Sequence, residues 1–123
     1  MLCETELERL TSLTQEFSPG QVIIKEGDHN ADLYILLSGE VEVIKGRRAI
    51  ATISERGAML GEMSTLLKKM RTASVRVTKF SKIIVVPESA VDRFFEKAPQ
   101  LGWKVAKQLA QRLEETTFSL YAR

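Results

Sequence analysis

Hydrophobic and polar residues follow three different patterns along the chain. Within residues 1–16, leucines at positions 7, 10 and 13 recur at helical spacing among acidic residues, which predicts a short N-terminal helix. From residue 17 to residue 87, short apolar or β-branched runs alternate with turns rich in glycine, proline and serine, which is typical of strands. Residues 88–123 return to helical spacing and are interrupted at Ala98 and Pro99, which predicts two C-terminal helices.

The strand region predicts an antiparallel jelly roll or barrel of about eight strands. Apolar residues on both sides of a glycine-containing turn at residues 45–47 predict a hairpin. A further pair of strands is expected after residue 73, turning near residues 79–81 and ending before Pro87. Residues 61–72 predict a helical turn whose Leu66 and Leu67 face the core. The expected fold class is therefore α+β, with an N-terminal helix, one short helix within the roll and two C-terminal helices.

The second C-terminal helix carries a broad apolar stripe. Its members lie three to four residues apart, or multiples of that spacing: Leu101, Val105, Leu109, Leu113 and Leu120. At about 1.5 Å per residue the helix extends over roughly 30 Å, more than a small barrel needs from one covering helix. We therefore expect part of the stripe to contact a second copy of the chain, and packing wholly against its own barrel is the alternative.

The composition fits one soluble domain spanning residues 1–123. Of the 123 residues, 44% are hydrophobic and 28% are charged, and no apolar run approaches the roughly 20 residues needed to cross a bilayer. We expect no secretory signal, and the single cysteine, Cys3, suits a reducing cytoplasm. A net charge of +2 from nearly balanced acidic and basic residues argues against nucleic-acid binding.

Catalysis is not supported by the residue types. His29 is the only histidine and lies in a polar turn, so neither a histidine-rich metal centre nor a Ser/His/Asp arrangement has enough members. One cysteine excludes a multi-cysteine metal site. We therefore expect no enzyme activity, no metal and no cofactor.

Residues 61–73 contain a candidate anion site. A helical turn that begins near Met63 and Ser64 leaves backbone N–H groups without helical partners, and these favour an anion. Arg71 supplies a permanently charged guanidinium that suits two phosphate oxygens. Further donors are the hydroxyl of Thr72 and the N–H of Ala73.

Glu62 cannot bind the same anion, but its carboxylate can accept a hydrogen bond from a sugar hydroxyl nearby. Together, Glu62 and Arg71 then predict a clamp for one phosphate and one ribose. A surface salt bridge between the two side chains explains their presence equally well on chemistry alone.

Two stretches of the sequence resemble the cyclic nucleotide-binding domain family. FSPGQVIIKEGDHNADLYILLSGEVEVI, residues 17–44, is similar to the first half of that domain. GAMLGEMSTLLKKMRTASVRV, residues 57–77, resembles its phosphate-binding cassette, including the ten-residue step from Gly61 to Arg71. Together they extend from residue 17 to residue 77 with one gap, and they imply that the chain binds a cyclic nucleotide.

The resemblance implies a role for each residue of the cassette, residues 61–73. Gly61 allows close backbone approach, Glu62 binds the ribose 2′-hydroxyl, and Arg71 binds the exocyclic phosphate oxygens. The cyclic phosphate also meets the amides near Met63 and Ser64, with Thr72 and Ala73 beside the arginine. Family members usually have a small residue, often proline, before the arginine, where this chain has Lys68, Lys69 and Met70. An aromatic often precedes the Gly–Glu pair, where this chain has Met59 and Leu60.

The resemblance also bears on the base and on regulation. A hydroxyl residue at position 72 contacts guanine in family members selective for cyclic GMP, and bacterial cyclic AMP receptors carry one as well. LAQRLEETTFSLYAR is similar to the long dimer helix of bacterial catabolite activator proteins, where two hydroxyl residues reach the adenine amino group. Thr116 and Thr117 match them, which favours cyclic AMP, with Phe118 and Tyr121 as further lid residues.

The implied function is that of a regulatory sensor domain. It binds a cyclic nucleotide, pairs as a homodimer through the last helix, and signals by movement of that helix to an effector outside this sequence. The alternatives are a cyclic GMP sensor and a β-roll interaction module that binds no ligand.

Overall fold

The computed structural model describes residues 13–121, with the side chains of residues 13–115. Its strands are β1 (Thr14–Phe17), β2 (Val22–Ile24), β3 (Leu33–Lys45), β4 (Arg48–Ile53), β5 (Met59–Leu60) and β6 (Ser74–Val86). Its helical segments are α2 (Glu62–Leu67), the 3-10 helix η2 (Glu88–Ala90), α3 (Val91–Lys97) and α4 (Pro99–Tyr121). The predicted break between Ala98 and Pro99 is confirmed, because α4 begins at Pro99, where a proline costs no helical hydrogen bond.

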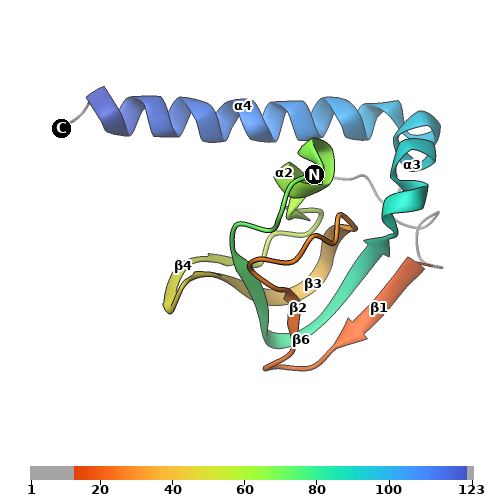
Figure 1. Cartoon of the computed structure of the whole chain (residues 1–123). Helices are drawn as coiled ribbons and strands as arrows, with labels where there is room; N and C mark the ends of the chain where they lie inside the picture. Colours follow the sequence, from red (N-terminus) through yellow and green to blue (C-terminus); the bar gives the residue numbers. More distant parts are fainter. Residues whose placement is uncertain (1–12, 122–123) are drawn as a thin grey trace.

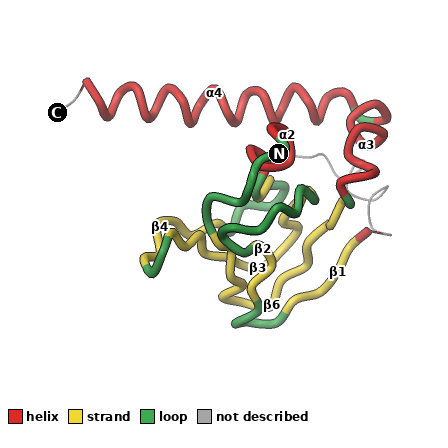
Figure 2. The backbone as a smooth tube through the Cα atoms, viewed as in Figure 1, coloured by secondary structure: helices red, strands yellow, loops and turns green. Residues whose placement is uncertain are grey.

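The strands pair antiparallel in one curled sheet with the order β1-β6-β3-β4, and β2 and β5 add to β6 and β3. The predicted hairpin at residues 45–47 is confirmed by the pairing of Lys45 with Arg48. Figure 1 and Figure 2 show α4 lying across one side of the curled sheet, with α2 between them. The sheet therefore supports the helices from a single side.

Two strands are longer than the sequence predicts. Strands β3 and β6 each contain 13 residues, with register shifts where β3 passes Gly39. A Cβ atom at Gly39 would lie 2.5 Å from the Phe80 carbonyl oxygen, so only glycine permits this approach of β3 to β6. The turn expected at residues 79–81 is wrong, because Lys79 stays paired with Glu40. Residues 13–121 thus contain six strands, not eight.

The N-terminal helix expected in residues 1–16 falls mainly outside the described residues. Its last positions, residues 14–16, belong to β1, which pairs with β6 from Thr14 opposite Ile84 to Phe17 opposite Ser81. The backbone hydrogen bonds that β6 offers at its edge decide the conformation of this short segment, whose own helical signal is weak.

The core consists of two apolar clusters on the two faces of β3. Successive residues of a strand point to opposite faces, so Leu33 and Ile35 pack with Phe94 and Leu101 of the helices. Tyr34 and Leu36 pack inside the roll. Strand β3 is therefore buried on both sides in its first half, as its continuous apolar run LYILL predicts.

Helix α4 packs on the sheet only through its first half. Leu101 and Val105 are buried, whereas Leu113 is 68% exposed, and the helix continues beyond the sheet in Figure 1. The predicted stripe therefore does not pack wholly against its own barrel. Within residues 13–121, no helix is long and apolar enough to span a membrane.

Candidate functional site

The cassette folds into α2 and the loop that follows it. Gly61 precedes the helix with φ 71°, a left-handed conformation that glycine adopts without steric cost. The Thr65 hydroxyl donates to the carbonyl oxygens of Asp32 at 3.0 Å and Gly61 at 3.2 Å. These contacts anchor the helix to the loop before β3.

The polar side of α2 faces the protein. Glu62, Ser64 and Thr65 are buried, while Leu66 and Leu67 are 44% and 55% exposed. The prediction that both leucines face the core is therefore wrong. Hydrogen bonds made by the buried polar side chains, rather than apolar packing, fix the rotation of this short helix.

Arg71 is the largest fully buried side chain of the described residues, at 2% exposure. Its guanidinium donates to the carbonyl oxygens of Gly61 at 2.8 Å and Asp32 at 2.5 Å, with Asn30 Oδ1 at 3.4 Å. The ring of Tyr34 lies 5.9 Å from its central carbon. The Arg71 N–H also donates to the Asp28 carbonyl at 2.7 Å. Side chain and backbone are thus both held in place.

Within residues 13–121, no carboxylate bonds to the guanidinium of Arg71, because its three acceptors there are neutral oxygens. Burial lowers the pKa of Arg71, and the nearby Tyr34, Asp32 and Asp28 act in the opposite direction. An arginine nevertheless remains charged in proteins. A buried cation without a bonded anion attracts a phosphate, and the fork of the guanidinium matches two phosphate oxygens.

Glu62 is equally buried, but its partners come from α4. One carboxylate oxygen, Oε1, accepts hydrogen bonds from Gln108 Nε2 at 3.1 Å and from the guanidinium of Arg112. In the described part of the chain, Glu62 and Arg71 therefore bond to other groups and not to each other. The alternative of a mutual salt bridge is contradicted by this arrangement.

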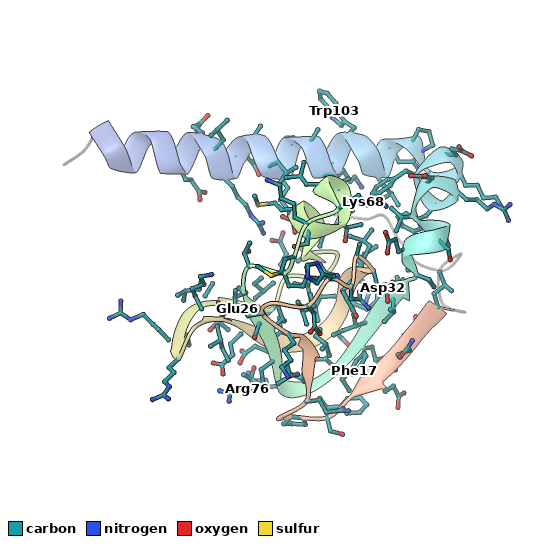
Figure 3. All side chains as sticks on the ribbon, viewed as in Figure 1. Phe17, Glu26, Asp32, Lys68, Arg76 and Trp103 are labelled. Carbon is teal, nitrogen blue, oxygen red and sulfur yellow. The ribbon has the colours of Figure 1, made fainter. Side chains whose placement is uncertain are left out.

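The end of the cassette is fastened to the β3–β4 hairpin through Glu26, which Figure 3 labels. Lys45 Nζ donates to the Thr72 carbonyl at 2.6 Å and lies 3.3 Å from Glu26 Oε2. The Gly46 N–H donates to the other carboxylate oxygen at 2.9 Å. These two donors, the Gly46 N–H first and then Lys45, lower the pKa of Glu26. The network fixes the backbone of the residue that follows Arg71.

The predicted site residues are thus only partly brought together by the structure. Gly61 and Arg71 are in direct contact, Ser64 is buried nearby, and Met63 and Thr72 are exposed. The side chains of the expected lid residues lie outside those that are described: Thr116, Thr117, Phe118 and Tyr121. Sequence reasoning missed Asn30, Asp32, Gln108 and Arg112. The spacing of the last two places them on one face of a helix, but nothing local indicates their partner Glu62.

No group of three or more potential metal ligands occurs among residues 13–121.

The sequence model of the cyclic nucleotide-binding domain family matches residues 14–98, more than half of the chain. The chain belongs to this family. The resemblance carried by residues 17–44 and 57–77 is confirmed, and the strands and helices agree with the jelly-roll fold of the family.

Relatives of this cyclic nucleotide-binding domain include proteins of different kinds. It is 35% identical to a cGMP-dependent protein kinase of Toxoplasma gondii over 76% of the chain and 10% of the kinase. It is 38% identical to a cAMP-dependent protein kinase regulatory subunit of Hypocrea atroviridis, over 65% of the chain and 17% of that protein. The catabolite activator protein of Thermus thermophilus superposes with a TM-score of 0.81 at 26% identity, over 97% of the chain and 59% of that structure.

The domain thus spans less than a fifth of each of these two kinase-related proteins. One relative is named for cyclic GMP and the other for cyclic AMP. Membership of the family therefore indicates a cyclic nucleotide as ligand but does not distinguish adenine from guanine.

Proposed function

We propose that this chain is a regulatory sensor domain that binds one cyclic purine nucleotide at the cassette and signals through α4. The observation that carries the proposal is Arg71. Among the described residues, its buried guanidinium is hydrogen-bonded only to neutral oxygens, and it directly contacts Gly61, ten positions earlier in the sequence. A structural arginine in such a position would be expected to pair with a carboxylate.

Each cassette residue then has a defined task. Arg71 exchanges its carbonyl partners for the exocyclic phosphate oxygens, and the amides near Met63 and Ser64 donate to the cyclic phosphate. Glu62 accepts a hydrogen bond from the ribose 2′-hydroxyl, and Gly61 allows the ligand to approach the backbone. Thr72 and Ala73 complete the contacts beside the arginine.

Cyclic AMP is the proposed ligand, and cyclic GMP is the alternative. Thr116 and Thr117 support this choice, because two hydroxyl groups on the last helix match the adenine amino group. Phe118 and Tyr121 lie on the same part of α4 and would cover the base as a lid. The hydroxyl of Thr72 suits either base.

The test is calorimetric titration of the chain with cyclic AMP, cyclic GMP and cyclic di-GMP. We expect saturable one-to-one binding of cyclic AMP, weaker binding of cyclic GMP and no binding of cyclic di-GMP. Absence of heat and of thermal stabilisation with both mononucleotides would instead establish the non-binding interaction module.

Glu62 supplies the proposed link between ligand and helix. The carboxylate oxygen that bonds Gln108 and Arg112 of α4 belongs to the group that would bind the ribose. A ribose hydroxyl that donates to this carboxylate competes with the two α4 side chains, so the bound and free states favour different positions of α4. The ligand therefore shifts an equilibrium by its unequal affinity for the two states.

Replacing Arg112 with alanine is expected to loosen the second half of α4 in the free chain. Glu62 would lose a charge-assisted hydrogen bond worth about 1.5–3 kcal/mol, and the second half of α4 would lose its ion pair with α2. Amide hydrogen exchange of residues 108–115 should accelerate about tenfold or more. Gln111→Ala, a matched change on an exposed position of the same helix, should leave the exchange almost unchanged. Equal exchange in Arg112→Ala and wild type would contradict the link.

Helix α4 also offers a surface for a second copy of the chain. Gly102, Ala106 and Leu109 line an apolar groove of about 210 Å³ with Leu66 and Phe95, and Leu113 continues the same helix face in solvent. We expect a dimer in sedimentation velocity experiments, and Leu113→Glu should shift it toward the monomer. A wild-type chain that stays monomeric at high concentration, with and without cyclic AMP, would contradict this pairing.

A further inference from the structure

The ladder of paired residues between β3 and β6 ends next to the cassette. Ile44 pairs with Ser74, the first residue of β6, and this is the last pair of the two strands at this end. Strand β3 nevertheless continues to Lys45, whose side chain donates to the Thr72 carbonyl at 2.6 Å. A lysine side chain therefore connects β3 to the cassette at the point where the ladder stops.

The peptide that joins Thr72 and Ala73 lies between two fixed positions of the backbone. On one side, the Arg71 N–H donates to the Asp28 carbonyl at 2.7 Å, and the Arg71 carbonyl accepts from the Gly27 N–H at 2.8 Å. On the other side, the residue after Ala73 begins β6. The peptide itself belongs to no helix or strand, so its orientation depends on its own contacts.

A single hydrogen bond orients this peptide. Within residues 13–121, the only donor to the Thr72 carbonyl is Lys45 Nζ. The peptide is trans, and in a trans peptide the C=O bond and the following N–H bond point in opposite directions. The Ala73 N–H therefore points away from Lys45, and it has no backbone acceptor in this part of the chain.

Glu26 holds the Lys45 side chain in place. Glu26 Oε2 lies 3.3 Å from Lys45 Nζ, and Oε1 accepts from the Gly46 N–H at 2.9 Å. The Glu26 N–H donates to the Ser74 hydroxyl at 2.9 Å, which joins this residue to the start of β6. The Lys45 side chain is 57% exposed, and an exposed ion pair contributes little to stability. We therefore expect Lys45 to matter for local geometry more than for the stability of the fold.

We propose that Lys45 is a positioning residue for the phosphate of the bound nucleotide. By holding the Thr72 carbonyl, it keeps the Ala73 N–H directed at the phosphate that Arg71 binds. The inference rests on the proposed function, because it concerns a donor to the same ligand. Without Lys45, the peptide can turn between its fixed neighbours, and the N–H faces the phosphate for only a fraction of the time. The apparent affinity falls in proportion to that fraction.

The first experiment is calorimetric titration of Lys45→Met with cyclic AMP. Methionine has a similar unbranched side chain but no donor for the Thr72 carbonyl. We expect binding about fivefold weaker than in wild type, as for the loss of one hydrogen bond. Lys45→Arg keeps a charged donor and should restore most of the affinity. Equal affinities for Lys45→Met and wild type would overturn the proposal.

Lys79→Met is the matched control. Lys79 Nζ also belongs to an exposed ion pair, 3.4 Å from Glu40 Oε2, but its partner is on β3 and not in the cassette. Its replacement should change the affinity for cyclic AMP by less than about twofold, and both methionine variants should unfold at similar temperatures. An equal loss of affinity in Lys79→Met and Lys45→Met would overturn the proposal, because the loss would then follow from net charge alone.

Nitrogen-15 relaxation of the Ala73 amide measures the orientation of the peptide directly. In the free chain, this amide should be more mobile in Lys45→Met than in wild type or Lys45→Arg, because the peptide is no longer held. Saturating cyclic AMP should remove the difference, since the phosphate then fixes the N–H. An Ala73 amide that is equally rigid in the free wild type and the free Lys45→Met variant would overturn the proposal, because Lys45 would then not orient it.

The inference and the proposed function fail in different ways. A wild-type chain that binds neither cyclic AMP nor cyclic GMP in the titration would contradict both. Binding by wild type with unchanged affinity in Lys45→Met would overturn the inference alone and leave the nucleotide site established. Weaker binding by Lys45→Met, restored in Lys45→Arg and absent from Lys79→Met, would support both.

Discussion

In calorimetric titrations, Arg71→Ala should bind cyclic AMP at least about tenfold more weakly than the wild-type chain. The guanidinium is expected to make charge-assisted hydrogen bonds to the phosphate, each worth about 1.5–3 kcal/mol, and 1.4 kcal/mol corresponds to a factor of ten. Alanine offers no donor to replace them. Arg71→Lys keeps the charge but loses the planar fork, so its affinity should lie between those of wild type and Arg71→Ala.

The control for this variant is Arg76→Ala. Arg76 lies on β6, five residues from Arg71, but its side chain is 48% exposed and pairs with Glu42 at the surface. Its removal should change the affinity for cyclic AMP less than twofold, because an exposed ion pair contributes about 1 kcal/mol or less to stability and none of it to the ligand. Equal affinities for Arg71→Ala and wild type, with both chains folded, would remove Arg71 from the site.

The parts of the fold that the sequence predicts well are those with local causes. The hairpin follows from Gly46, which supplies the positive φ of a tight turn, and the start of α4 follows from Pro99. The prediction of eight strands was wrong at residues 79–81, where polar residues suggested a turn. Strand β6 continues through these residues for a nonlocal reason. Lys79 pairs with Glu40 of β3, and Gly39 allows β3 to approach β6 closely.

In the candidate site, too, the features with local causes could be predicted and those with nonlocal causes could not. Glu62 and Arg71 can be selected from the sequence by charge, spacing and resemblance, but their partners cannot. Arg71 bonds to Asp32, 39 positions away, and Glu62 bonds to Arg112, 50 positions away. No periodic pattern links such distant residues. The predicted orientation of Leu66 and Leu67 was wrong for a related reason. The buried hydrogen bonds of Thr65 determine how this short helix is rotated and outweigh its apolar pattern.

Gly61→Ala adds a single methyl group and should strongly disturb the proposed nucleotide site. A Cβ atom at this position would lie 2.4 Å from Arg71 Nη1 and 3.0 Å from Ile24 Cδ1, and φ is 71°. The guanidinium would have to leave its hydrogen bond to the Gly61 carbonyl, and because it is buried it has little room to move. We expect at least a tenfold loss of affinity for cyclic AMP, comparable with that of Arg71→Ala, measured by the same titration.

Gly46→Ala separates this steric effect from the strain of the backbone. Gly46 has φ 63°, nearly the same conformation, but a Cβ atom there would meet nothing within 4 Å. Both variants should therefore lose about 1–2 kcal/mol of unfolding free energy from the left-handed backbone. Gly61→Ala should unfold at a lower temperature than Gly46→Ala, because its added carbon also displaces the buried Arg71. Only Gly61→Ala should also lose affinity for cyclic AMP, since only there does the added carbon displace Arg71. If Gly61→Ala binds cyclic AMP as tightly as Gly46→Ala does, the contact between Gly61 and Arg71 has no part in recognition of the phosphate.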